Sequence, residues 1–217
     1  MTDSKRTGRM IGVLLLLQLV GLMVGFILLD ALRTTEYLTS AAGDSARIKA
    51  GVIVLLANGA LTIGISIKAW QFFREHSPQM GIWLILLSVI MLVMQAVDSV
   101  HIMSMIAMSQ EQANGMAGIT DALAASVRFP RRYAHYLELF AIDFWLMMFY
   151  AILFRFALVS RIVVGFSLVT VLLQFFSVPV PGFLGYPLSP NLAIPLAFGL
   201  FATAVWSIAR GFTHREA

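Results

Sequence analysis

The sequence predicts an all-α polytopic membrane protein, a bundle of six transmembrane helices with one short amphipathic helix at the membrane interface. Of the 217 residues, 59% are hydrophobic and only 12% are charged, whereas soluble domains carry about 25% charged residues. The mean hydropathy is +0.87. No apolar window alternates with the period of two that membrane β-strands show. We therefore expect a single transmembrane domain over residues 1–217.

Six apolar windows approach or exceed the ~20 residues that a spanning helix needs. They cover residues 10–32, 49–73, 80–108, 133–158, 162–178 and 191–211. The first window is longer than the roughly 7–15 apolar residues of a signal peptide, so we expect it to be retained as a helix. Gly21 and Gly25 within it form a G-x-x-x-G pattern, which predicts close packing on another helix of the same chain. Pro195 predicts a kink in the last window.

The connection between the third and fourth windows contains a short amphipathic pattern. Its apolar residues recur at offsets of three, four and four, at Met116, Ile119, Leu123 and Val127. This spacing predicts one apolar face of a helix lying on the membrane surface. We expect that helix to end at Phe129-Pro130, because proline disfavours helical geometry in the residue before it.

The distribution of lysine and arginine predicts that both termini are cytoplasmic. With the N-terminus inside, the outer segments hold six of the 15 basic residues, namely Arg33, Arg47, Lys49, Arg128, Arg131 and Arg132, and the inner segments hold the other nine. Basic residues favour the cytoplasmic side. With six crossings, the bias favours a cytoplasmic location for both the N-terminus and the C-terminus.

Several classes of function lack support in the sequence. Because the chain has no cysteine, it has no disulfide, thiolate metal site or cysteine nucleophile. It contains no H-E-x-x-H, G-x-S-x-G or Walker-type motif. The basic residues are spread over many loops rather than clustered, so the expected partner is the lipid bilayer and not nucleic acid. The oligomeric state is left open.

Ionisable residues nevertheless lie inside the predicted spans. In an up-down bundle, the end of an odd span and the start of the next even span lie in the same half of the membrane. That half should hold Asp30, Asp98, His101, His135, Glu138 and Asp143. The cluster is periplasmic if the N-terminus is cytoplasmic. Such intramembrane charges are costly and are commonly functional.

The spacing of these residues indicates how they are arranged. Residues three apart share a helix face, so Asp98 should point with His101, and His135 with Glu138. We expect the two pairs to face each other across neighbouring helices. Asp143 lies about 80° around the helix from His135, and we expect it to face Asn58 or Asp30.

Three interpretations of this polar cluster remain open. The groups are interhelical contacts that hold the bundle together, or they form a proton relay or ligand-binding cavity. The third interpretation is a metal site, because imidazole and carboxylate suit a divalent ion such as zinc or iron. Its ligands would be drawn from Asp98, His101, His135 and Glu138.

The last third of the chain resembles a known family. A Tyr–aliphatic–Phe-Arg run precedes Leu-Val-x-Arg, and a Leu-Pro-Leu-like helix ends in a basic-Gly-Phe tail; the matching residues are Tyr150, Phe154, Arg155, Leu158, Val159, Arg161, Pro195, Leu196, Arg210, Gly211 and Phe212. This pattern is similar to the C-terminal half of an uncharacterised family of bacterial six-helix membrane proteins, a domain of unknown function. A glutamate frequent in that family's last helix is replaced in the region of Leu200 and Phe201. The resemblance implies a bacterial inner-membrane protein and no particular activity.

Our leading hypothesis is a non-enzymatic multi-pass protein whose outward-facing polar cavity binds a small ligand, ion or proton, without a cofactor. It would act as a sensor, an accessory subunit or a small transporter. The alternative is a metal-dependent membrane enzyme that uses a bound divalent ion on a lipid or another apolar substrate. The candidate binding residues are Asp98, His101, His135, Glu138, Asp143, Asp30 and Asn58.

Overall fold

The computed structural model describes residues 3–32, 37–115, 121–188, 191 and 194–212, and within these ranges the chain is helical with no strand. The elements in chain order are α1 (Asp3–Leu28), η1 (Asp30–Leu32), α2 (Tyr37–Ser40), α3 (Ser45–His76), α4 (Pro78–Ala113), α5 (Asp121–Arg155), α6 (Arg161–Ser177), α7 (Pro179–Leu184) and α8 (Ile194–Arg210). The all-α prediction is therefore confirmed for the described residues.

Five helical stretches are long and apolar enough to cross a membrane. They are α1, α3, α4, α5 and the stretch formed by α6 with α7. The last predicted window corresponds to α8, which has 17 residues and is shorter than a usual span. The class of multi-pass membrane protein is supported, whereas the count of six spanning helices is not confirmed.

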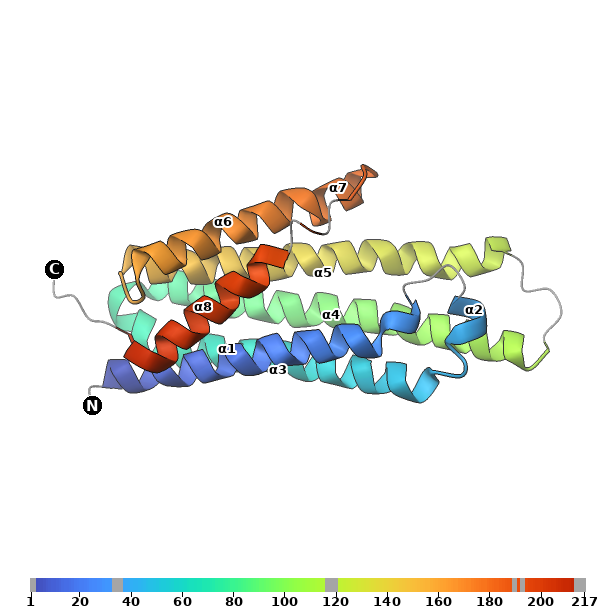
Figure 1. Ribbon diagram of the computed structural model, residues 1–217, viewed down its shortest axis with the longest axis horizontal. Helices are drawn as coiled ribbons and strands as arrows, with labels where there is room; N and C mark the ends of the chain where they lie inside the picture. Colours follow the sequence, from blue (N-terminus) through green and yellow to red (C-terminus); the bar gives the residue numbers. More distant parts are fainter. Residues whose placement is uncertain (1–2, 33–36, 116–120, 189–190, 192–193, 213–217) are drawn as a thin grey trace.

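The helices form an elongated bundle with both ends of the described chain at one end (Figure 1). α1, α3, α4 and α5 lie side by side along the long axis, while α8 crosses α1 obliquely and α6 leans away from α5 toward α7. Ser4 donates a hydrogen bond to the carbonyl oxygen of Phe212 over 3.3 Å. This contact joins the two ends of the described chain. We call this the terminal end of the bundle and the opposite one the far end.

α4 and α5 are longer than a membrane is thick. With 36 and 35 residues, they extend over roughly 54 and 52 Å, compared with ~30 Å of hydrocarbon. Their excess length at the far end packs against α2. There the Tyr37 hydroxyl donates to the carbonyl of Ala124 over 2.9 Å, and the Ser109 hydroxyl donates to that of Leu38 over 2.7 Å. α2 therefore ties the first loop to the projecting ends of α4 and α5.

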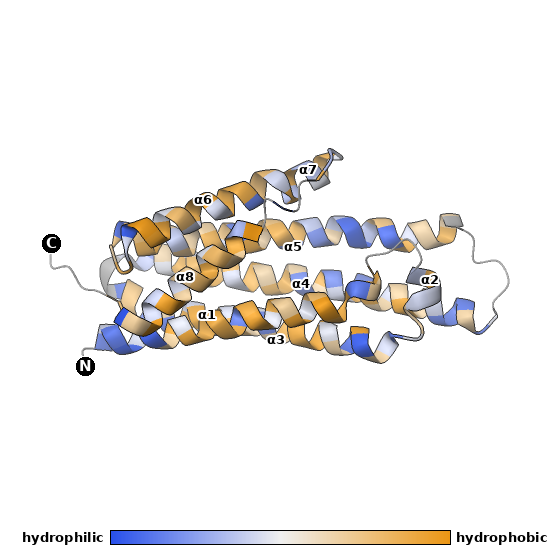
Figure 2. Cartoon of the chain, viewed as in Figure 1, coloured by the Kyte–Doolittle hydropathy of each residue, from blue (hydrophilic) through white to orange (hydrophobic). Residues whose placement is uncertain are grey.

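Two apolar cores lie in sequence along the bundle. The larger core, at the terminal end, is built from α1, α3, α4, α5, α6 and α8 and includes the large buried side chains of Trp145, Phe149 and Tyr150. The smaller core, at the far end, includes Leu29, Tyr37, Ile102, Met105 and others. Toward the far end, the residues of α5 change from mostly hydrophobic to mostly hydrophilic (Figure 2). The candidate site lies at this transition.

The predicted interfacial helix is not confirmed, and its predicted end at Phe129-Pro130 is wrong. Met116 and Ile119 lie outside the described residues, whereas Leu123 and Val127 belong to the first turns of α5. α5 continues through Pro130 without interruption. A proline removes one N–H donor from the helix. Pro130 is exposed on the projecting part of α5, where a freed carbonyl can accept from water.

The prediction of intrachain packing by the G-x-x-x-G pattern is confirmed. A Cβ added at Gly21 would lie 2.8 Å from Oδ1 of Asn58, and one at Gly25 would lie 2.5 Å from Leu55, both on α3. The prediction of a kink at Pro195 is wrong. α8 begins at Ile194, so Pro195 occupies its first turn, where a missing N–H breaks no helical hydrogen bond.

The crossing of α1 with α8 depends on Gly12, and this gives a first prediction. A Cβ at Gly12 would lie 2.7 Å from the backbone oxygen of Ala204, whereas one at Gly64 would meet nothing within 4 Å. Backbone cannot be relieved by a rotamer change, so Gly12→Ala should destabilise the protein by ~1–3 kcal/mol. Gly64→Ala, the control, should be neutral or stabilising. Thermal unfolding in detergent measures both, and equal behaviour of the two variants would contradict this packing.

Candidate functional site

Four ionisable side chains meet between α4 and α5 near the far end. Asp98 comes from α4, and Arg131, His135 and Glu138 come from α5. Nε of Arg131 lies 3.3 Å from Oδ1 of Asp98, and Nδ1 of His135 lies 3.9 Å from Oδ2 of the same carboxylate. Nδ1 of His135 also lies 3.3 Å from Oε2 of Glu138. We call these four residues the polar cluster.

The polar cluster follows from the helical period of α5. Arg128, Arg131, His135 and Glu138 recur at offsets of three, four and three, which places them on one face of a helix. Sequence reasoning did not detect Arg131 as a member. A helix end was expected at Phe129-Pro130 and the next span was expected to begin at residue 133, so Arg131 lay between two predicted helices. Its spacing with His135 and Glu138 becomes apparent because α5 is continuous.

Burial makes the interactions of the polar cluster energetically important. The side chains of Asp98 and Glu138 are only 3% and 6% exposed. Oδ1 of Asp98 and Nε of Arg131 are close but not aligned for a hydrogen bond, so the pair is held by charge. Removing one partner of a buried ion pair leaves an uncompensated charge, which is far costlier than removing both.

The polar cluster forms one wall of a cavity of about 520 Å³. Pockets of 300–1,000 Å³ are typical of small-molecule sites. The polar wall carries Asp98, Arg128, Arg131, Arg132, His135, Tyr136 and Glu138, and the remaining lining residues are Leu22, Phe26, Leu29, Leu32, Leu55, Met105, Phe129, Leu139, Ile142, Val178 and Leu188. All charged lining residues therefore come from α4 and α5, whereas the lining residues of α1, η1 and α3 are all apolar.

Arg128 and Arg132 line the cavity without a carboxylate within 4.0 Å among the described residues. Nε of Arg132 donates to the Tyr136 hydroxyl over 3.0 Å, and its guanidinium lies 5.7 Å from the centre of that ring. The ring of Tyr136 packs directly on Gly182 of α7, which leaves no room for a Cβ there. α7 therefore fixes the position of Tyr136 and, through it, that of Arg132.

Arg128 links the cavity to α2. Its guanidinium lies 5.7 Å from the ring centre of Phe129. Burial raises the pKa of Tyr37 above its ordinary value, and the positive charge of Arg128 partly offsets this rise. Tyr37 therefore remains a hydroxyl donor at neutral pH, and Arg128 both lines the cavity and lies near enough to Tyr37 to act on its charge.

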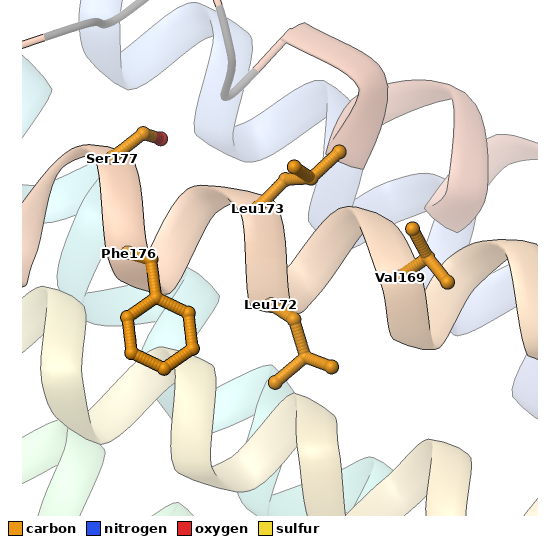
Figure 3. A pocket seen from close by; sticks show the side chains of 5 residues that line it. All are labelled: Val169, Leu172, Leu173, Phe176 and Ser177. Carbon is orange, nitrogen blue, oxygen red and sulfur yellow. The ribbon is translucent and has the colours of Figure 1, made fainter.

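A second hollow, of about 270 Å³, lies on α6. It is lined by Val169, Leu172, Leu173, Phe176 and Ser177 (Figure 3). None of these side chains is titratable at physiological pH, and four of the five are apolar. Such a surface suits contact with lipid chains and carries no chemistry of its own.

The structure brings only part of the predicted site together. His101 is half-buried but neither lines the cavity nor lies within 4.0 Å of Asp98. Asn58 packs against Gly21, and Asp30 is exposed in η1. Asp143 is fully buried, with no hydrogen-bond partner among the described residues, so its expected contacts with Asn58 or Asp30 are not found. Of the predicted site residues, the structure brings only Asp98, His135 and Glu138 together.

These three residues also satisfy a geometric condition for metal binding. Asp98, His135 and Glu138 each offer one ligand atom, and the three atoms lie within 4.8 Å of one another. His101, the fourth residue of the predicted ligand set, is not part of this group. The three donors belong to two different helices and line the same cavity.

The fold and the cavity together define a multi-pass helical membrane protein with a polar and apolar cavity near one end of its bundle. The chain belongs to a family described as a domain of unknown function (DUF4386), whose model matches residues 10–211. The match extends the similarity seen in the last third of the sequence to nearly the whole chain. Comparison with curated proteins and with solved structures found no match.

The ion pair between Asp98 and Arg131 gives a second prediction. Arg131→Gln should destabilise the protein by ~1–3 kcal/mol, because it leaves the Asp98 carboxylate buried without its cation. Adding Asp98→Asn should restore much of the loss. A double-mutant cycle by thermal unfolding in detergent should therefore show coupling of ~0.5 kcal/mol or more.

The control for this cycle pairs Asp98→Asn with Arg74→Gln. Arg74 is exposed in the last turn of α3, toward the terminal end, so those two effects should be additive. Additivity in both cycles would mean that Asp98 and Arg131 do not interact in the folded protein.

Proposed function

We propose that this protein binds an amphipathic ligand with an anionic head in the cavity between α1, α3, α4 and α5, as a sensor, an accessory subunit or a small transporter rather than as an enzyme. The observation that carries this proposal is that one cavity is lined by charged side chains of α4 and α5 and by wholly apolar side chains of α1 and α3. The ligand's head would lie against the arginines, and its apolar body would lie along α1 and α3.

The charge of the polar wall favours an anionic head. The wall holds three guanidinium groups and two carboxylates. Asp98 is paired with Arg131, and Glu138 contacts His135. Arg128 and Arg132 then remain without a carboxylate partner among the described residues. Guanidinium groups bind phosphate and carboxylate oxygens well because their N–H donors form a planar fork.

The apolar wall favours a ligand that enters from the membrane. Leu22 and Phe26 of α1 and Leu55 of α3 face the cavity, and both helices are long enough to span a bilayer. Burial of an apolar chain against these side chains would contribute ~25 cal/mol per Å² of surface removed from water. A free inorganic anion would leave this wall unused.

A binding experiment tests the proposal. Purified protein in a neutral detergent should be stabilised by phosphatidylglycerol but not by phosphatidylcholine, and only weakly by inorganic phosphate. Ligand at 100-fold excess over Kd adds ~2.7 kcal/mol, which corresponds to a rise in Tm of about 5 °C or more for a chain of this size. Equal stabilisation by both lipids would overturn the anionic head, and stabilisation by phosphate alone would overturn the amphipathic ligand.

Matched variants assign the effect to the cavity. Arg128→Gln with Arg132→Gln should abolish the selective stabilisation, whereas Arg74→Gln at the opposite end should retain it. Leu139 lines the cavity and Leu137 is exposed on the same helix. Leu139→Trp should therefore block binding and Leu137→Trp should not. Loss of selectivity in Arg74→Gln or Leu137→Trp would place the ligand elsewhere.

The orientation in the membrane is the other part of the proposal. We propose a bacterial inner-membrane location with both termini cytoplasmic, so that the cavity opens toward the periplasm. The excess of basic residues in the inner segments supports this, as does the position of Ser4 beside Phe212. A C-terminal green fluorescent protein fusion should fluoresce, whereas a C-terminal alkaline phosphatase fusion should be inactive. The opposite pair of signals would place the cavity on the cytoplasmic side.

A further inference from the structure

We infer that Asp98, His135 and Glu138 form a binding site for one divalent transition-metal ion, with zinc as the best-fitting ion. This inference goes beyond amphiphile binding, because the ion requires no lipid. It rests on the positions of the three donor atoms, on their burial and on the cavity beside them.

The donor spacings match those around a tetrahedral ion. Ligand atoms at ~2.1 Å from zinc in tetrahedral geometry lie about 3.4 Å from one another. Nδ1 of His135 lies 3.3 Å from Oε2 of Glu138 and 3.9 Å from Oδ2 of Asp98. All three donors lie within 4.8 Å of one another. An ion at their centre therefore requires only small side-chain adjustments.

The surroundings of the donors favour an ion over a purely structural contact. Asp98 is nine-tenths or more buried and lines the cavity, and its Oδ1 has no aligned hydrogen bond. The donor group itself holds two buried carboxylates beside Arg131 and an imidazole, so it is locally negative and suits a divalent cation, whereas Arg128 and Arg132 make the wall as a whole cationic. Arg131 contacts Oδ1 and leaves Oδ2 toward His135, so it can orient the carboxylate as outer-shell partners of ligands do.

The chemistry of the donor set narrows the class of ion. One imidazole nitrogen and two carboxylate oxygens suit zinc or a neighbouring divalent transition metal rather than calcium, which prefers six to eight oxygens. Three protein ligands leave a fourth position, and all three side chains line the cavity. An open position of this kind binds water or a ligand oxygen.

Metal analysis of the full-length protein tests the inference. Protein is stripped with chelator in a neutral detergent without added lipid, incubated with Zn²⁺ and desalted. Inductively coupled plasma mass spectrometry should then find about one zinc per folded chain. Replacement by Co²⁺ should give the visible absorption of a four- or five-coordinate site. A folded protein that retains no zinc, or that gives an octahedral cobalt spectrum, overturns the assignment.

The variants include a control on α4, the helix that carries Asp98. His135→Asn and Glu138→Gln should each lower zinc affinity by at least about 10-fold. His101→Ala removes an imidazole three residues from Asp98 and outside the donor group, and it should keep full binding. Circular dichroism and thermal unfolding verify that each variant is folded; His135 is the most exposed of the three ligands, so its variant should fold. Retained zinc in His135→Asn, or loss in His101→Ala, overturns the assignment.

The lipid measurements and the metal measurements test the two proposals independently. Zinc binding is measured without lipid, and lipid binding is measured in chelator. Loss of lipid selectivity with intact zinc stoichiometry would refute the proposed ligand alone. Retained lipid selectivity in a protein that binds no zinc would refute the metal site alone.

Discussion

The contact between Asp98 of α4 and Arg131 of α5 is the constraint on which the arrangement of the far end depends. Apolar side chains along two long helices permit several registers, because one aliphatic contact can replace another at little cost. A buried carboxylate permits only a register that gives it a cation. With Arg131 3.3 Å from Asp98, the facing positions of α4 and α5 are fixed, and His135 and Glu138 are brought to the same level on the next turns of α5.

The cavity lies where the two apolar cores meet, because its lining includes Leu29 and Met105 of the far-end core and Ile142, which packs against the terminal-end core. α8 has only 17 residues, crosses α1 obliquely and begins near the middle of the bundle (Figure 1). The core at the terminal end is filled by α6 and α8, whereas the core at the far end is built from η1, α2 and the projecting parts of α3, α4 and α5. The two cores are therefore built from different sets of elements, and the cavity lies at their junction.

Much of the fold followed from apolar window lengths, which located the long helices and the packing of Gly21 and Gly25. The sequence predicted the candidate site less completely than it predicted the fold. The spacing of His135 and Glu138 correctly indicated one face, and segment parity correctly placed them beside Asp98. His101 was expected to point with Asp98, but it neither belongs to the donor group nor lines the cavity, because two residues three apart share a face only approximately. Arg131 was missed because proline was treated as a helix end. On a projecting, exposed stretch of α5, the loss of one donor at Pro130 was not enough to end the helix.

A purely structural role explains Asp98 and Arg131 but not the rest of the polar wall. If these charges served only to join α4 to α5, one ion pair would suffice, and the neighbouring positions would be better filled by apolar side chains. The wall instead adds Glu138, His135 and two further arginines. Arg132 is positioned by Tyr136, and Tyr136 by Gly182 of α7. Burying acids and orienting cations around a space costs stability that packing alone would not require. Under the proposed function, a ligand of matching charge in the cavity would offset that cost.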